Sequence, residues 1–207
     1  MRPAALFLAA SLLQAGAPAP ERATAFERAV VQEMSDARVT PKAYAEHLKA
    51  LRGDFEGTLW RLPGKVPLRT EEGVAALDEA IRFLETTRPA GPLRFNEGLA
   101  RAARAHARYL GPRGLLSHQG ADGSGPAARL DRLGRWQSLV AENISTGEDD
   151  PRLVVIQLLV DDGVPSRGHR RNLFNPDLHQ AGAGEAPHTA YGTVCVIDYA
   201  DGFVADP

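Results

Sequence analysis

The chain has 207 residues, of which 43% are hydrophobic and 24% are charged, a balance typical of a globular protein with one main domain. Its formal net charge is −2, and its arginines are scattered along the chain. The composition provides no basic surface for nucleic acid, so we expect no nucleic-acid partner. The single cysteine, Cys195, excludes an intramolecular disulfide, and packing must therefore stabilise the fold.

The first residues have the pattern of an export signal. Arg2 supplies a positive start, residues 4–13 are apolar or small, and further small residues follow. The apolar run is well under the ~20 residues that a membrane-spanning helix needs, so we expect no transmembrane segment in the mature chain. We predict a signal peptide over residues 1–19 and a secreted or periplasmic protein. The alternative is a buried N-terminal helix, which Pro18 and Pro20 disfavour.

Residues 20–90 are predicted to form a helical N-terminal extension. Thr24 and Glu27 have the spacing of a capping box ahead of a helix that runs to about Ala37. A second helix is predicted over residues 40–51, because it opens with a threonine followed by a proline. Both helices would pack beside the rest of the chain.

The second half of this extension contains a predicted loop and a third helix. Glycines and prolines recur between residues 53 and 69, which predicts a loop or linker. Thr70 is then predicted to cap a helix with one apolar face. The residues of that face are Val74, Leu77, Ile81 and Leu84. Such a helix needs a surface to pack on, and covering the following domain is the role that we expect.

The next segment places one histidine on a helix and another in a loop. Asn96 starts a predicted helix on which His106 recurs with apolar residues, so His106 is interpreted as a packing residue. His118 lies in the glycine-rich stretch 111–125, where we expect a loop that displays functional side chains. Pro126 opens a short helix after it.

The last third of the chain is predicted to contain a buried helix and two strands. Asp150 caps a helix that is apolar almost throughout and must be covered on most sides. Strand-like runs follow near residues 181–185 and 192–199. Cys195 lies in the second run, where we interpret it as a small buried hydrophobic residue without chemistry.

Four phrases in order give this half of the chain a family resemblance. They are the helix at 99–106, Ser117-His118, Ala-Glu-Asn-Ile at 141–144, and Gly-His-Arg-Arg-Asn at 168–172, followed by Gly182-Ala-Gly184. From Leu93 to about Phe203 the chain resembles the CAP superfamily, which includes cysteine-rich secretory proteins and many bacterial single-domain members. The resemblance implies an α+β fold, a three-layer α-β-α sandwich with a small antiparallel sheet, over residues 91–207. It also implies an exported protein.

The resemblance also implies a cleft lined by two histidines and two acids. Three corners carry over directly as His118, Glu142 and His169. The second glutamate of the family is absent, and Asp161 or Asp162 stands in its region. We expect Asp162 rather than Asp161 at this corner, with the shorter reach of an aspartate.

Two interpretations of this cleft are open. Neutral imidazoles suit Zn²⁺ or another divalent cation, with His118 and His169 as the metal ligands and carboxylates adjusting the charge. The alternative is a hydrogen-bonded polar cluster in which Glu142 and the aspartate orient the histidines without a metal. No organic cofactor is expected.

Residues beside the cleft are given structural roles. Asn143 is interpreted as a residue that hydrogen-bonds to backbone rather than as a catalyst. Arg167, Arg170 and Arg171 flank His169 and are interpreted as solvated arginines at a helix end.

Three functions are compatible with these residues. The first is a non-enzymatic binding module whose cleft holds a divalent metal and whose groove takes a lipid, a sterol or another cell-envelope component. The second is a metal-assisted peptidase or esterase in which Glu142 and His118 are catalytic. Against it, the His-Glu-x-x-His helix is absent, and neither Ser117 nor Ser166 has a nucleophile-elbow pattern. The third is a structural envelope or adhesion module.

Overall fold

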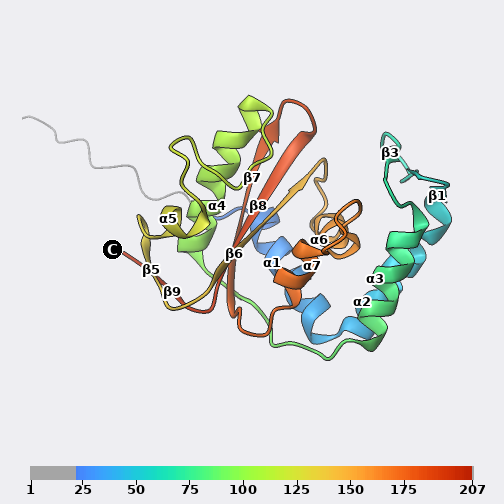
Figure 1. The fold of residues 1–207 in the computed structure, drawn as a ribbon, viewed down its shortest axis with the longest axis horizontal. Helices are drawn as coiled ribbons and strands as arrows, with labels where there is room; N and C mark the ends of the chain where they lie inside the picture. Colours follow the sequence, from blue (N-terminus) through green and yellow to red (C-terminus); the bar gives the residue numbers. More distant parts are fainter. Residues whose placement is uncertain (1–21, 207) are drawn as a thin grey trace, which may run out of the picture.

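A computed structural model describes residues 22–206, and its centre is one four-stranded sheet between two helical layers (Figure 1). The strands are, in sheet order, β4 (Arg94–Phe95), β7 (Gln180–His188), β8 (Gly192–Ala200) and β6 (Val140–Thr146). One face is covered by α4 (Glu97–Leu110), and the other by α1 (Ala25–Val39), α6 (Pro151–Val160) and α7 (Gly168–Phe174). The predicted α+β sandwich is confirmed. The sheet is mixed rather than antiparallel, because β4 runs parallel to β7.

Further elements flank the sandwich at both ends (Figure 1). On one side lie α2 (Pro41–Ala50), the turn Arg52–Asp54, β1 (Phe55–Glu56), β2 (Leu59–Trp60), β3 (Leu68–Arg69) and α3 (Val74–Thr86). On the other lie the turn Gly111–Arg113, α5 (Pro126–Leu130), β5 (Gly134–Trp136) and β9 (Phe203–Ala205). No helix among residues 22–206 is long and apolar enough to cross a membrane. The predicted signal peptide over residues 1–19 lies outside the described residues.

The start of α1 follows its sequence pattern, whereas the start of α3 does not. Thr24 Oγ1 accepts a hydrogen bond from the Glu27 backbone at 3.1 Å, and the Glu27 carboxylate accepts one from the Thr24 backbone at 2.9 Å. This confirms the capping box. The prediction that Thr70 caps α3 was wrong, because the Thr70 hydroxyl donates to the Thr58 carbonyl. The helix begins after Gly73 instead.

The predicted loop over residues 53–69 contains a small antiparallel sheet of β1, β2 and β3, which we call the accessory sheet. Its strands have two residues each, so they lack the alternating run from which a strand is predicted. Trp60 on β2 is buried and stacks on Phe55 with ring centroids 5.5 Å apart. The accessory sheet is therefore anchored by aromatic packing rather than by strand length.

One hydrophobic core extends through both predicted segments, 20–90 and 91–207. It joins Met34 of α1 and Leu77 of α3 to residues of α6 and of the central sheet. Helix α1 is thus one component of the sandwich, in the same layer as α6 and α7. Cys195 is buried in this core, where burial raises the pKa of its thiol, which confirms its packing role.

Helix α4 lies directly on β7 because two glycines face it. A Cβ atom at Gly182 would come within 2.0 Å of the Ala100 backbone nitrogen, and one at Gly184 within 2.0 Å of the Arg104 nitrogen. No other residue permits so close an approach of helix and strand. The Gly182-Ala-Gly184 phrase therefore sets the distance between these two layers.

A buried ion pair joins the two helical layers at the edge of β7. Arg104 of α4 donates to both oxygens of Glu27 of α1, at 2.8 and 2.6 Å, and both side chains are nearly inaccessible to solvent. Glu27 also accepts a hydrogen bond from the Glu185 backbone at 3.3 Å, on β7 beyond the part that β4 pairs with. The carboxylate thus covers a free section of strand edge.

We expect Arg104→Met to destabilise the protein by about 3 kcal/mol, because it leaves the Glu27 carboxylate buried without its partner. Urea unfolding followed by circular dichroism measures this loss. The matched control is Arg61→Met in the exposed Arg61–Glu56 pair, where the change should stay within about 1 kcal/mol. Equal effects of the two substitutions would show that burial of the pair is not what matters.

Candidate functional site

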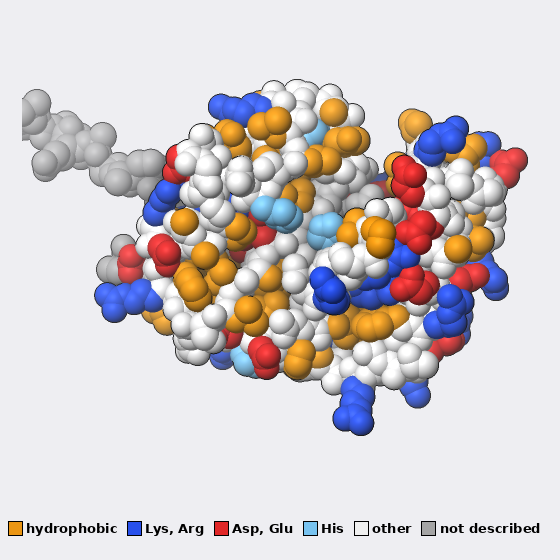
Figure 2. Space-filling model, in the orientation of Figure 1, with side chains coloured by type: hydrophobic (Ala, Val, Ile, Leu, Met, Phe, Trp, Pro, Cys, Tyr) orange, Lys and Arg blue, Asp and Glu red, His pale blue; other side chains and the backbone are white. Residues whose placement is uncertain are grey.

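Two histidine–carboxylate pairs lie beside β6, and they contain three of the four predicted cleft residues. His118 Nδ1 lies 2.7 Å from Glu142 Oε1, and His169 Nδ1 lies 2.6 Å from Asp161 Oδ1. His118 comes from the loop before α5, Glu142 from β6, and His169 from the first turn of α7. Figure 2 shows histidine side chains together near the centre of one face, where the surface is hollowed.

Two asparagines hold the pairs in one cleft. Asn143 Nδ2 donates to the His169 carbonyl at 3.0 Å, which confirms its interpretation as a backbone-bonding residue. Asn172 Nδ2 donates to Asn143 Oδ1 at 2.9 Å and to the Glu142 carbonyl at 3.3 Å. These bonds fix α7 against β6, so the two histidines are held on a common scaffold. The role of Asn172 was missed in the sequence, although it ends the Gly-His-Arg-Arg-Asn phrase.

Asp161, and not Asp162 as expected, is the carboxylate that contacts the His169 ring. Asp161 caps α6 with a left-handed backbone (φ 53°), which turns its carboxylate toward α7. There it accepts from both the ring and the backbone N–H of His169. The Asp162 carboxylate points the other way and accepts from the backbone nitrogens of Glu71 and Glu72 at 2.6 and 2.9 Å. The two neighbouring aspartates thus bind different partners, His169 for Asp161 and the backbone of residues 71–72 for Asp162.

His106 anchors the loop that carries His118. Its Nε2 donates to the Ser117 carbonyl at 2.8 Å from a buried position on α4, which confirms it as a packing residue. Burial lowers the pKa of its imidazole, so the ring stays neutral. Ser117 Oγ accepts from the Gln119 backbone, and no hydrogen bond between a serine hydroxyl and an imidazole occurs within residues 22–206. Neither Ser117 nor Ser166 is therefore activated by a histidine here.

Both carboxylate oxygens of Glu142 are engaged. His118 contacts one oxygen, and Arg129 of α5 forms an ion pair with the other. Arg129 also donates to the His118 carbonyl at 2.8 Å, so it supports the whole pair. No sequence pattern singles out Arg129, because it lies on a short helix with no motif of its own. The arrangement suits a carboxylate that orients an imidazole.

A second acid, Asp198, lies behind Glu142. It is the cross-strand partner of Glu142 on β8 and is 1% exposed. No hydrogen bond of ordinary geometry joins its oxygens to another described residue. Burial, and then the negative charge of Glu142, holds the pKa of Asp198 well above its usual value. One charged residue in the apolar run 194–200 was the sequence signal for it.

The arginines beside His169 are mostly not solvated, contrary to prediction. Arg170 is buried and donates to the Val160 carbonyl and to Glu79 of α3. Arg167 pairs with Glu72 and Glu79, and this pairing lowers the pKa of Glu72 to about 2. Only Arg171 is exposed. The sequence could not reveal these bonds, because the carboxylates come from α3 and the turn before it, some 90 residues earlier.

The two histidines each leave one ring nitrogen without a carboxylate partner. Within residues 22–206, no group of three His, Cys, Asp or Glu side chains is arranged to hold a metal ion. Each of His118 and His169 turns Nδ1 toward a carboxylate, which leaves Nε2 as the nitrogen for a ligand. Metal-binding histidines commonly have such a carboxylate behind them. Glu142 and Asp161 each orient one imidazole in this arrangement.

We expect Asp198→Asn to be more stable than the wild type at pH 7 and equally stable near pH 4. Below the ordinary value of 3.8, the folded and unfolded states both hold the proton. Above it only the unfolded state releases the proton, so the wild type loses about 1.4 kcal/mol for each unit of pKa elevation, and asparagine does not. Urea unfolding between about pH 4 and 7 measures the difference. A stability difference between Asp198→Asn and the wild type that is the same at every pH would contradict the raised pKa of Asp198.

Comparison with known proteins adds a family. A model of the cysteine-rich secretory protein family, CAP, matches residues 60–199, so the match begins inside the 20–90 segment. The uncharacterized protein YkwD of Bacillus subtilis is 29% identical over 93 residues, which are 45% of this chain and 34% of YkwD. The chain therefore spans about a third of that relative.

Two solved structures are similar over part of the chain. An extracellular protein containing an SCP domain from Bacillus anthracis is 22% identical with a TM-score of 0.43, over 54% of this chain and 34% of that one. An outer surface protein from Borrelia burgdorferi is 20% identical with a TM-score of 0.46, over 61% of this chain and 89% of that one.

Proposed function

Because this chain belongs to the CAP family of cysteine-rich secretory proteins, we propose that it is an exported binding module built around the β6 cleft. The observation that carries the proposal is the pair of histidine–carboxylate contacts, 2.7 and 2.6 Å long, held at one strand edge. Because a carboxylate holds Nδ1 of each histidine, the two Nε2 atoms are available to a ligand. The ligand would be a component of the cell envelope or the surrounding medium.

A divalent cation is the first ligand of this cleft in our proposal. His118 and His169 would bind Zn²⁺ or a similar ion through Nε2, with the remaining positions open to water or to a second ligand. Glu142 and Asp161 would set the ring orientation. Bound metal would supply a positive centre that attracts carboxylate or carbonyl oxygens.

Binding is favoured over hydrolysis by the state of Glu142. A general base needs a free oxygen within reach of the proton that it removes. Here one oxygen faces His118, the other pairs with Arg129, and the side chain is 1% exposed. Glu142 is therefore better suited to hold His118 than to activate water.

Export is part of the same proposal and rests on the pattern of residues 1–19. The positive start and short apolar run are those of a secretory signal. Fractionation of the producing cell should find the mature chain outside the cytoplasm, in the periplasm or the medium. Full-length chain in the cytoplasmic fraction would contradict it.

We expect the protein to bind Zn²⁺ with an affinity that falls at least about 10-fold in His118→Ala and in His169→Ala, measured by isothermal titration calorimetry. Asp161→Asn should weaken binding by about 10-fold or more, because it frees the His169 ring. Asp162→Asn is the matched control and should bind like the wild type, since Asp162 faces residues 71–72.

Two results would contradict the metal site. One is the absence of heat on titration with Zn²⁺ while the protein remains folded. The other is an affinity that is the same in the wild type and in the double variant His118→Ala, His169→Ala. In either case the cleft would be a hydrogen-bonded polar cluster that binds its ligand without a metal.

A further inference from the structure

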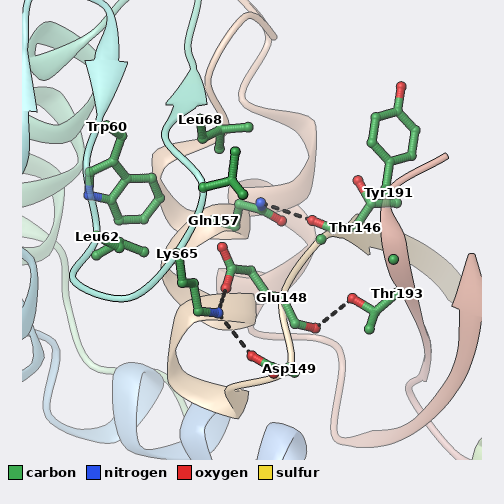
Figure 3. A pocket seen from close by; sticks show the side chains of 13 residues that line it. Trp60, Leu62, Lys65, Leu68, Thr146, Glu148, Asp149, Gln157, Tyr191 and Thr193 are labelled. Carbon is green, nitrogen blue, oxygen red and sulfur yellow. Dashed lines mark hydrogen bonds and ion pairs between the residues drawn. The ribbon is translucent and has the colours of Figure 1, made fainter.

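Two adjoining cavities form a groove along β6, which we call the edge groove. The first, about 350 Å³, begins at His169 and Asp161 and is lined by Ile144 of β6. The second, about 420 Å³, continues from it to Tyr191 and Glu148 (Figure 3). Both cavities are lined by Trp60, Leu68, Thr146 and Gln157. The edge groove therefore leads out of the proposed cleft.

The accessory sheet supplies the wall opposite β6. In Figure 3, Trp60 and Leu68 of that sheet lie across the cavity from Thr146 and Tyr191. Large apolar side chains are exposed along the rim, namely Val66 at 89%, Tyr191 at 52% and Leu116 at 51%. Apolar exposure of this kind beside a cavity marks a binding surface.

The hydrogen-bond register shows which β6 residues face the edge groove. At the two ends of the β6–β8 pair, the Gly147 nitrogen donates to the Thr193 carbonyl and the Asp201 nitrogen donates to the Leu139 carbonyl. In an antiparallel pair such bonded residues alternate with residues whose N–H and C=O point away. The even-numbered residues from Val140 to Thr146 therefore turn their backbone groups outward, away from β8.

Ile144 presents an unpaired N–H and C=O in this edge. The carbonyls on either side are capped by side-chain amides, Glu142 by Asn172 at 3.3 Å and Thr146 by Gln157 at 3.1 Å. No hydrogen bond from another described residue reaches the outward groups of Ile144. β6 is also the last strand of the central sheet. This position can accept one further strand.

The lining of the edge groove has an excess of negative charge. Its cations are Lys65 and Arg69, and its carboxylates are Glu148, Asp149, Asp161 and Asp162. These six side chains carry a net charge of −2. At the far end of the groove, as Figure 3 shows, the single positive charge of Lys65 faces both Glu148 and Asp149, so an excess of negative charge remains there. An anionic ligand is disfavoured and a cationic one is favoured.

We propose that the edge groove binds an extended, basic polypeptide segment, which pairs with Ile144 as an added strand and places alternate apolar side chains against Trp60 and Leu68. Addition of a strand to an exposed sheet edge is an established mode of peptide binding. An acyl chain would bury the Ile144 N–H and C=O without partners, at a cost in free energy. The bound peptide segment would lie next to the proposed β6 cleft, so this inference rests on the function proposed above and deepens it.

The probe is a pool of acetylated, amidated hexapeptides in which Lys or Arg alternates with Val, Leu, Ile or Phe. A matched pool carries Asp or Glu in place of the basic residues, and oleate tests the acyl alternative. In ¹⁵N-labelled protein, the basic pool should shift the Ile144 and Trp60 resonances, and the acidic pool should bind at least about 10-fold more weakly. N-methylation of every second peptide nitrogen should abolish binding in one register and spare it in the other.

Protein variants provide the second arm. Leu68→Asn should weaken binding of the basic pool at least about 10-fold, because it removes an apolar side chain from the groove wall without changing the charge. The control is Val204→Asn at another exposed apolar residue, which lies on β9 outside the groove and should change nothing. Both proteins must keep the circular dichroism spectrum of the wild type.

The outcomes separate this inference from the metal proposal. The inference is overturned if neither peptide pool shifts Ile144, if N-methylation has no effect in either register, or if oleate alone perturbs the groove. Zn²⁺ titrations in the same samples report on His118, which does not line the edge groove. Peptide binding without Zn²⁺ binding would leave the edge groove intact and remove the metal, and the reverse result would remove only the peptide.

Discussion

The buried pair between Glu27 and Arg104 is the contact on which the arrangement of the other layers depends. It reaches around the edge of β7 and ties α1, on one face of the sheet, to α4, on the other. Beside it, Gly184 allows the α4 backbone to touch the strand. Because α4 is fixed in this way, the loop that follows its C-terminal end has a defined position.

The cleft is a consequence of that position. His106 on α4 ties down the loop at Ser117, and this brings His118 to Glu142 on the far strand β6. From the opposite layer, Asn143 secures α7, and α7 carries His169. Each histidine therefore comes from a different helical layer, and the strand edge between them is the common reference. The positions of the two histidines therefore depend on both helical layers.

The segment before residue 91 contributes to the site as well as to the core. Glu79 of α3 and Glu72 just before it hold Arg167 and Arg170, and thus the turn between Asp161 and His169. The accessory sheet forms one wall of the edge groove. These contacts give the extension a role in orienting the cleft and in shaping the groove that leads from it. The cavity exists because the two parts of the chain pack together.

The sequence by itself determined most helices and the two long C-terminal strands, because these follow from local periodicity and caps. Its resemblance to the CAP superfamily implied the sandwich and the residues His118, Glu142 and His169. Only the tertiary structure decided between Asp161 and Asp162, since a left-handed residue at the end of α6 turns adjacent side chains in opposite directions. It alone revealed Asp198 beside Glu142, the burial of Arg170 and the accessory sheet. Each of these depends on contacts between residues far apart in the chain, which no local pattern encodes.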